Sequence, residues 1–213
     1  LEPLKKHQIE YNFYYIDEQF EPLFDYNLIK SNEAFLYINY FGLKDSFIFQ
    51  IPKFCKNLII DATQSFFSKP IKNVDTFYSP RKFFGVPDGA YLYSNKTLEM
   101  SFGKDVSFDR CSHLLKRLDC GAEKGYEDFK DNEANLKYQD IREMSTLTQT
   151  LLTAIDYNLC AEKRKINFKF LHKKLKKTNK LIFDLVGIGV PMVYPYWNGD
   201  VTLKHKLLEN KVY

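Results

Sequence analysis

Residues 58–93 read LIIDATQSFFSKPIKNVDTFYSPRKFFGVPDGAYLY and contain three short apolar runs separated by turn residues. The runs at 58–60, 76–78 and 90–93 are predicted β-strands. They are continuous instead of alternating, which is typical of strands covered on both faces of a sheet. The stretch therefore predicts an α/β layer with a mostly parallel sheet.

The sequence on either side extends this layer. Residues 34–39 (AFLYIN) are a further apolar strand that ends at a Gly42 turn, and residues 11–16 (YNFYYI) are another strand candidate. Residues 192–196 (MVYPY) are a predicted strand, in which Pro195 indicates a sheet edge or a position near the strand's end. Residues 201–208 are predicted to form a closing helix.

Between residues 138 and 179 there is neither Pro nor Gly, and a stripe of apolar residues recurs every three or four positions from Ile141 to Leu159. This spacing predicts a long helical region. The spacing loosens near Lys163, which leaves open a division into two helices.

Residues 163–180 hold nine Lys or Arg and no acid. One interpretation is contact with an anionic partner, such as a nucleic acid or a membrane surface. We favour the other, a solvated helix face with the four apolar residues of the run turned inward: Phe168, Phe170, Leu171 and Leu175.

The composition excludes several classes. The 213 residues are 45% hydrophobic and 27% charged, so wholesale disorder is excluded, and no apolar run approaches the ~18–20 residues of a membrane span. A net charge of +4 does not suggest a nucleic-acid binder. Four widely spaced cysteines make no C-x-x-C pair and are typical of reduced thiols in a cytoplasmic protein. The four histidines show no metal spacing.

Two segments of the opening stretch carry candidate chemistry. Asp61 ends a buried strand, where open α/β sheets bind ligands. Lys82 follows Asp61 by 21 residues, in an aromatic setting before a Gly/Pro turn. Burial there would disfavour the ammonium and leave a nucleophilic amine. An upstream Asp could contact the ring nitrogen of pyridoxal phosphate and make the ring an electron sink.

Asp61-Ala-Thr-Gln64 and the Ser79–Ala90 loop around Lys82 resemble the Asp-Ala-Ala-Gln and lysine-loop motifs of the DegT/DnrJ/EryC1/StrS sugar aminotransferases. These are fold type I enzymes of the aspartate aminotransferase superfamily. Thr63 replaces the usual Ala, and Asp88-Gly-Ala90 stands in place of Glu-Gly-Gly. Asn39-Tyr-Phe-Gly42 lies where the family has a turn beside the cofactor.

The resemblance implies a pyridoxal 5′-phosphate enzyme that forms a Schiff base on Lys82 and transfers an amino group from an amino acid to a nucleotide-linked keto-sugar or similar carbonyl compound. Asp61 would pair with the ring nitrogen and Gln64 would lie against the ring. Ser79 would hold the phosphate, with a structural role favoured for Arg81, and Asn39 would touch the ring hydroxyl. A homodimer is implied, without nucleic-acid or membrane partners.

The resemblance also implies a domain organisation. Residues 1–135 would be the cofactor-binding large domain, 136–180 a linking helical region and 181–213 part of a small α/β domain. The family's phosphate-binding Gly/Ser loop should precede these strands, so the chain is expected to be the central portion of a longer protein.

Each site residue also has an ordinary structural interpretation. Asp61 could cap the following segment, Lys82 and Gln64 could be surface residues, Ser79-Pro80 could form a plain turn, and Asn39 commonly precedes a Gly turn. Their joint occurrence at predicted strand ends favours a cofactor site. The alternative functions are a non-catalytic scaffold or regulatory protein of the same fold and, less favoured, a binder of anionic surfaces through residues 163–180.

Overall fold

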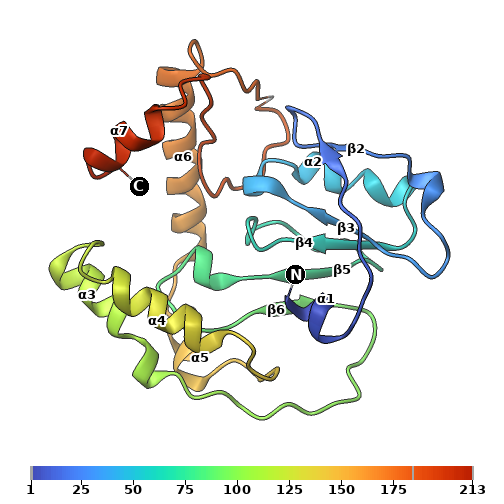
Figure 1. Ribbon diagram of the computed structural model, residues 1–213, viewed down its shortest axis with the longest axis horizontal. Coiled ribbons are helices and arrows are strands. Elements are labelled where there is room, and N and C mark those ends of the chain that lie inside the picture. The colour runs from blue at the N-terminus through green and yellow to red at the C-terminus, as the bar shows by residue number, and fades with distance from the viewer. Residues whose placement is uncertain (1, 184, 213) are drawn as a thin grey trace.

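The computed structural model describes residues 2–183 and 185–212 (Figure 1). Its strands are β1 (Tyr15–Ile16), β2 (Pro22–Leu23), β3 (Phe35–Ile38), β4 (Leu58–Asp61), β5 (Asp75–Tyr78) and β6 (Tyr91–Tyr93). Its α-helices are α1 (Glu2–Lys6), α2 (Asp45–Ile48), α3 (Ser112–Cys120), α4 (Tyr126–Leu136), α5 (Thr146–Thr153), α6 (Tyr157–Leu175) and α7 (Leu203–Glu209). Short 3₁₀ turns are η1 (Tyr26–Leu28), η2 (Tyr40–Gly42), η3 (Ile51–Lys53), η4 (Pro80–Lys82) and η5 (Phe108–Arg110).

The central sheet has the strand order β3-β4-β5-β6. The first three strands are parallel and β6 runs antiparallel to β5. The predicted mostly parallel sheet is confirmed, and each of its strands lies within a residue or two of a predicted apolar run. Of residues 11–16, however, only β1 is paired, in a separate two-stranded sheet with β2.

One face of the sheet carries the hydrophobic core. Phe35 and Tyr37 of β3 and Leu58 and Ile60 of β4 are buried there against Ile48 of α2 and other residues of the β3–β4 connection. Each such side chain contributes roughly 1.5–3 kcal/mol when it is removed from water. This core fixes the positions of the strand ends that hold the candidate site.

The opposite face is only partly covered, so the prediction of a sheet covered on both faces is wrong for the described residues. Leu36 of β3 and Leu92 of β6 are 40% and 53% exposed on it. The strand order explains this. Parallel strands are joined by right-handed crossovers, and β3, β4 and β5 follow one another in one direction across the sheet. Both crossovers therefore lie on the same face.

The helical region divides into α5 and α6, as the loosened spacing allowed, but the break lies at residues 154–156 and not near Lys163. Side-chain caps set both starts: Ser145 accepts a hydrogen bond from the amide of Thr148, and Asp156 accepts one from the amide of Leu159. The helix predicted from residue 138 consequently begins only at α5.

The basic run lies on α6 and the turn after it, and the inward placement of its apolar residues is only partly right. Phe168 is buried, whereas Phe170 is 59% exposed and Leu171 is also exposed. Residues two apart in a helix lie about 200° apart around its axis, so Phe168 and Phe170 cannot share a face. The prediction for Phe170 is therefore wrong.

Residues 192–196 form no strand, contrary to prediction, whereas α7 confirms the closing helix. Met192 donates one backbone hydrogen bond to the carbonyl of Phe41 (2.7 Å), and the Pro195 carbonyl accepts from the side chain of Asn179. The segment is thus held by separate hydrogen bonds and not by the repeated backbone hydrogen bonds of a β-sheet.

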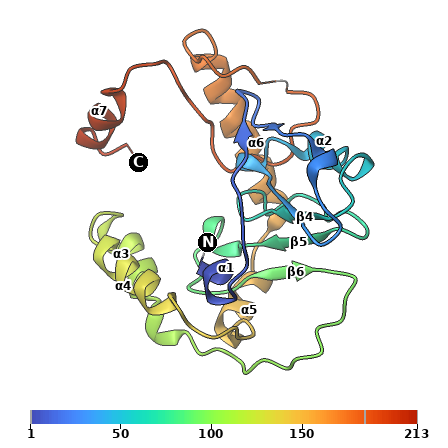
Figure 2. The ribbon, with the colours of Figure 1, turned by 45° about the vertical axis from the view of Figure 1, so that its right-hand side comes forward.

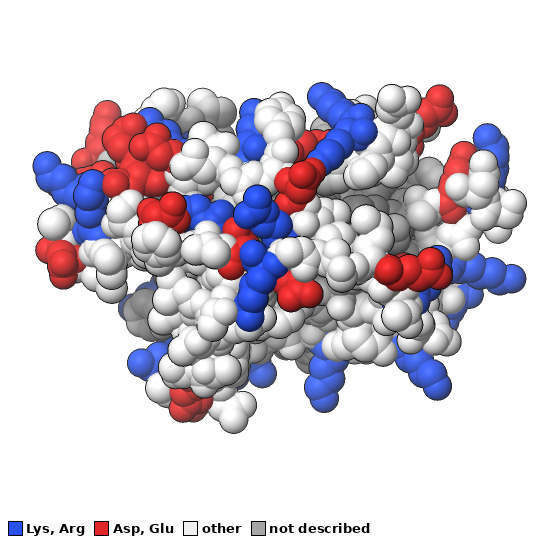
Figure 3. Space-filling model, turned by 90° about the horizontal axis from the view of Figure 1, so that it is seen from below, with Lys and Arg blue, Asp and Glu red and all other residues white. Residues whose placement is uncertain are grey.

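The helices α3, α4 and α7 lie to one side of the sheet. Figure 2 shows α3 packed against α4 there, reached from β6 by a long extended segment, with α7 above them. Seen from below, the surface mixes Lys and Arg with Asp and Glu (Figure 3). In residues 2–183 and 185–212 no helix combines the length and apolar character that crossing a membrane requires.

Gly42 joins the end of β3 to the C-terminal segment, and its replacement by Ala is expected to destabilise the fold by about 2–4 kcal/mol. Its φ is +72°, and an added Cβ would lie 2.6 Å from the backbone oxygen of Val190. The left-handed conformation alone costs roughly 1–2 kcal/mol for Ala. Urea unfolding would measure the loss.

Gly103→Ala is the matched control for this prediction. Gly103 lacks a left-handed φ, and an added Cβ would meet nothing within 4 Å. Equal stabilities for the two variants would contradict the role assigned to Gly42.

Candidate functional site

The predicted site residues gather at the carboxyl edge of the sheet. Asn39 directly follows β3, Asp61 is the last residue of β4, and Ser79 directly follows β5. The three strands are parallel, so these ends lie at the same edge, where α/β sheets bind ligands. Lys82 ends η4, immediately after β5.

Lys82, Thr63 and Asp61 form a contact chain at this edge. Lys82 Nζ donates a hydrogen bond to Thr63 Oγ1 (3.0 Å), and the Thr63 amide donates one to Asp61 Oδ1 (2.8 Å). One residue, Thr63, thus contacts both the lysine and the carboxylate that the motifs single out. Thr63, noted in the sequence only as a departure from the family motif, connects them.

The Lys82 side chain is exposed, so the expectation of a buried lysine is wrong. The aromatic residues around it pack elsewhere. Phe83 is buried, with its ring 5.8 Å from that of Phe66, and Phe84 packs on Phe66 and on Tyr157 of α6. These contacts anchor the loop and leave Lys82 directed toward Thr63 and solvent.

Gln64 holds the turn after β3. Its Oε1 accepts a hydrogen bond from the amide of Phe41 (3.1 Å), a residue with a φ of +57°. A left-handed conformation is unfavourable for an aromatic residue and persists only where its surroundings hold it. Gln64 therefore links the Asp61 segment to η2, and Nε2 is its remaining donor group.

The side chain of Asn39 lies on the other side of the sheet from Asp61. Ile38 pairs with Asp61 in the β3–β4 register, so the next residue points to the opposite face. There Asn39 Nδ2 donates to Asp45 Oδ1 (2.7 Å) and to Ser68 Oγ (3.0 Å). The structure does not bring the Asn39 amide to Lys82.

Asp45 is the acid at the centre of that second cluster. Its Oδ1 also accepts from Ser68 Oγ (2.5 Å). Burial raises the pKa of the Asp45 carboxyl, and the hydrogen bonds from Ser68 and Asn39 oppose the rise only in part. Gly189 packs directly on this carboxylate, because an added Cβ would overlap Asp45 Oδ2. The cluster thus fastens the C-terminal segment to the end of β3.

Ser79 and Arg81 occupy the turn before the lysine. The Ser79 hydroxyl caps no backbone amide of η4 and is half-buried, so it remains available to a ligand. Arg81 forms an ion pair with Glu133 of α4. This contact assigns Arg81 to the attachment of α4, in keeping with a structural role.

Arg164 of α6 supports the lysine loop and was not singled out in the sequence. Its guanidinium lies 4.7 Å from the ring centroid of Phe83 and donates to the Phe83 carbonyl (3.3 Å) and the Met192 carbonyl (3.0 Å). The only signal in the sequence was its place in a basic run, where it resembles its solvated neighbours.

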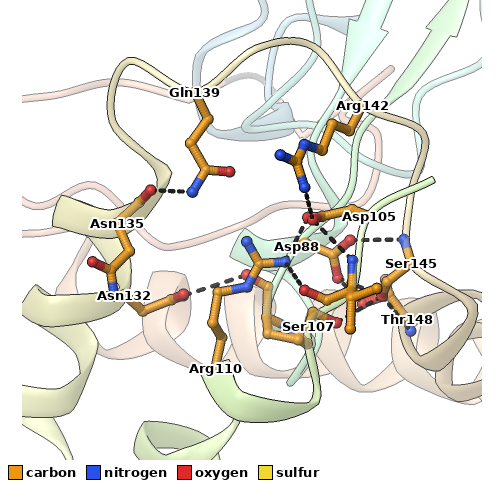
Figure 4. A network of polar contacts seen from close by, with 12 residues as sticks. Asp88, Asp105, Ser107, Arg110, Asn132, Asn135, Gln139, Arg142, Ser145 and Thr148 are labelled. Carbon is orange, nitrogen blue, oxygen red and sulfur yellow. Dashed lines mark hydrogen bonds and ion pairs between the residues drawn. The ribbon is translucent and has the colours of Figure 1, made fainter. Parts of the chain in front are cut away.

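Asp88, which stands where the related motif has Glu, lies in a polar network and not beside Lys82. It is 4% exposed and accepts hydrogen bonds from the Ser145 amide (2.9 Å), the Ser145 hydroxyl (2.9 Å) and the Thr148 hydroxyl. Figure 4 shows this carboxylate at the start of α5, next to the ion pair of Arg110 with Asp105.

No protein-family model, curated protein or solved structure matches this chain. The function of the chain is therefore inferred from the geometry of its own site.

Proposed function

We propose that this protein is a pyridoxal 5′-phosphate-dependent aminotransferase that acts on a nucleotide-linked keto-sugar or a similar small carbonyl compound. The proposal is carried by the contact chain from Lys82 through Thr63 to Asp61 at the carboxyl edge. An amine that can attach to an aldehyde and a carboxylate that can hold a ring N–H are the groups that this cofactor requires. The donor set fits the cofactor in both respects.

Each residue of the site would have a role that follows from its chemistry. Bound pyridoxal phosphate supplies an electron-withdrawing ring for amino-group transfer. Lys82 Nζ would hold it covalently and, once displaced by the amino donor, would carry a proton. The Asp61 carboxylate would accept a hydrogen bond from the ring N–H. Ser79 Oγ would donate to the phosphate, and Gln64 would offer Nε2 at the ring.

The amino donor would be an amino acid such as glutamate. By resemblance to the sugar aminotransferases, the working form would be a cytoplasmic homodimer.

Reductive labelling tests the proposal. The full chain is incubated with limiting pyridoxal phosphate, reduced with borohydride, digested and mapped by mass spectrometry. We expect Lys82 to carry at least about ten times more label than Lys69, an exposed lysine in the β4–β5 connection, since a tenfold preference needs only about 1.4 kcal/mol of specific binding. Label no greater on Lys82 than on Lys69 would refute the assignment.

The same experiment addresses a second candidate, a non-catalytic scaffold or regulatory protein of this fold. Two observations favour it: Lys82 is exposed, and the Asn39 amide is occupied by Asp45 and Ser68. Labelling spread evenly over the exposed lysines would support this function instead.

A further inference from the structure

We propose that Thr63 is a positioning residue for Lys82, whose amine its hydroxyl holds at the carboxyl edge of the sheet, next to the turn that Asp61 caps. The purpose of this positioning, covalent attachment of the cofactor, rests on the proposed function. The contact itself does not, and it can be tested without any cofactor.

The first step of the argument is the geometry. Thr63 Oγ1 accepts from Lys82 Nζ at 3.0 Å, while the backbone amide of the same residue donates to Asp61 Oδ1 at 2.8 Å. One residue thus fixes the carboxylate with its backbone and the lysine with its side chain. The β-branched Thr side chain has few χ1 rotamers, so little freedom is lost when it holds this arrangement.

The second step is the chemistry of a hydroxyl. A carboxylate partner would favour the ammonium, which cannot attack an aldehyde. A hydroxyl both donates and accepts, so Thr63 can accept from the ammonium and donate to the lone pair of the neutral amine. Within residues 2–183 and 185–212, Lys82 forms no ion pair with a carboxylate. No carboxylate therefore competes with the Thr63 hydroxyl for the amine.

The third step is the exposure of Lys82. A long, exposed lysine side chain samples many rotamers, and ordering it costs up to about 2 kcal/mol. The Phe83 and Phe84 packing fixes only the backbone of the loop. The Thr63 hydroxyl lies within hydrogen-bond distance of the end of the side chain and holds it at the carboxyl edge.

Competitive acetylation of the cofactor-free protein at pH 8 tests the contact. The contact holds Nζ against Thr63 and shields it from a reagent in solution, so Thr63→Val should raise the labelling of Lys82 relative to Lys69 about threefold, as expected for an exposed hydrogen bond. Thr63→Ser keeps the hydroxyl and should label like the wild type. Thr63→Ala replaces the Val variant if that variant does not fold. Equal Lys82 labelling in the wild type and the Val or Ala variant would overturn the proposal.

A titration with pyridoxal phosphate, monitored by absorbance, tests whether the positioning of Lys82 supports cofactor binding. We expect the affinity of Thr63→Val to fall about fivefold and that of Thr63→Ser to stay within about twofold of the wild type. Unchanged affinity in the Val variant, despite raised acetylation, would overturn the positioning role. Failure of the wild type to bind the cofactor would refute the proposed function, while the acetylation result would still decide the contact.

Discussion

Replacement of Lys82 by Ala is expected to abolish covalent attachment of pyridoxal phosphate and to lower the rate of amino-group transfer by at least about 10³-fold. The amine of Lys82 is the group in contact with Thr63, which is in turn bonded to Asp61. The variant would lose both the covalent anchor and the proton carrier of the proposed reaction. The absorbance spectrum of the protein with cofactor and a single-turnover assay would measure the two losses.

Two further variants make this result specific. Lys82→Arg keeps the positive charge but not the nucleophilic amine, so it should lose attachment as completely as the Ala variant. Lys69→Ala removes an exposed lysine of the β4–β5 connection and should leave both measurements unchanged. A covalent band that survives in Lys82→Ala would contradict the proposed function.

The strands of the central sheet could be predicted because their signal is local. Each apolar run buries residues such as Phe35 and Ile60 in the core, and turn residues bound it. The partly covered face could not be predicted, because it depends on strand order. A continuous apolar run looks the same whether its crossovers lie on one face or on two.

The candidate site, too, could be predicted from the sequence only in part. Asp61 and Lys82 lie at one edge because parallel strands end there, which follows from the strand prediction. The placement of Asn39 depends on register. A shift of one residue turns a side chain to the other face, and a single sequence does not give the register of β3 against β4.

The start of α5 depends on a distant residue. The apolar spacing suggested a helix from residue 138, but the helix begins after Ser145, which is bonded to Asp88 far upstream. Contacts between segments that lie far apart in the sequence leave no periodic signal. The same holds for the Thr63–Lys82 contact, which joins two connections of the sheet.

Asp88→Ala is expected to destabilise the protein by roughly 3–5 kcal/mol at neutral pH. The carboxylate is 4% exposed and accepts from three donors, the Ser145 amide and hydroxyl and the Thr148 hydroxyl. Each buried donor left without an acceptor costs about 1–3 kcal/mol. The charge also lies at the N-terminus of α5, where the helix dipole favours an anion. Urea unfolding at pH 7 would measure the loss, with the exposed Asp109→Ala as a control expected within about 0.5 kcal/mol of the wild type.

The pH dependence of this loss identifies its cause. Burial by itself would raise the pKa of Asp88, but the hydrogen bonds from Ser145 and Thr148 outweigh it and hold the pKa below its usual value. A carboxyl whose pKa is lowered in the folded state adds stability above its unfolded pKa, about 3.9, and loses that contribution as the pH falls through the folded value. The difference in stability between wild type and Asp88→Ala should therefore narrow below about pH 4. Carboxyls far from Asp88 titrate alike in both proteins, so they do not affect this difference in stability. A difference that stayed constant down to pH 3 would show that lost packing, and not loss of the charged acceptor, causes the destabilisation.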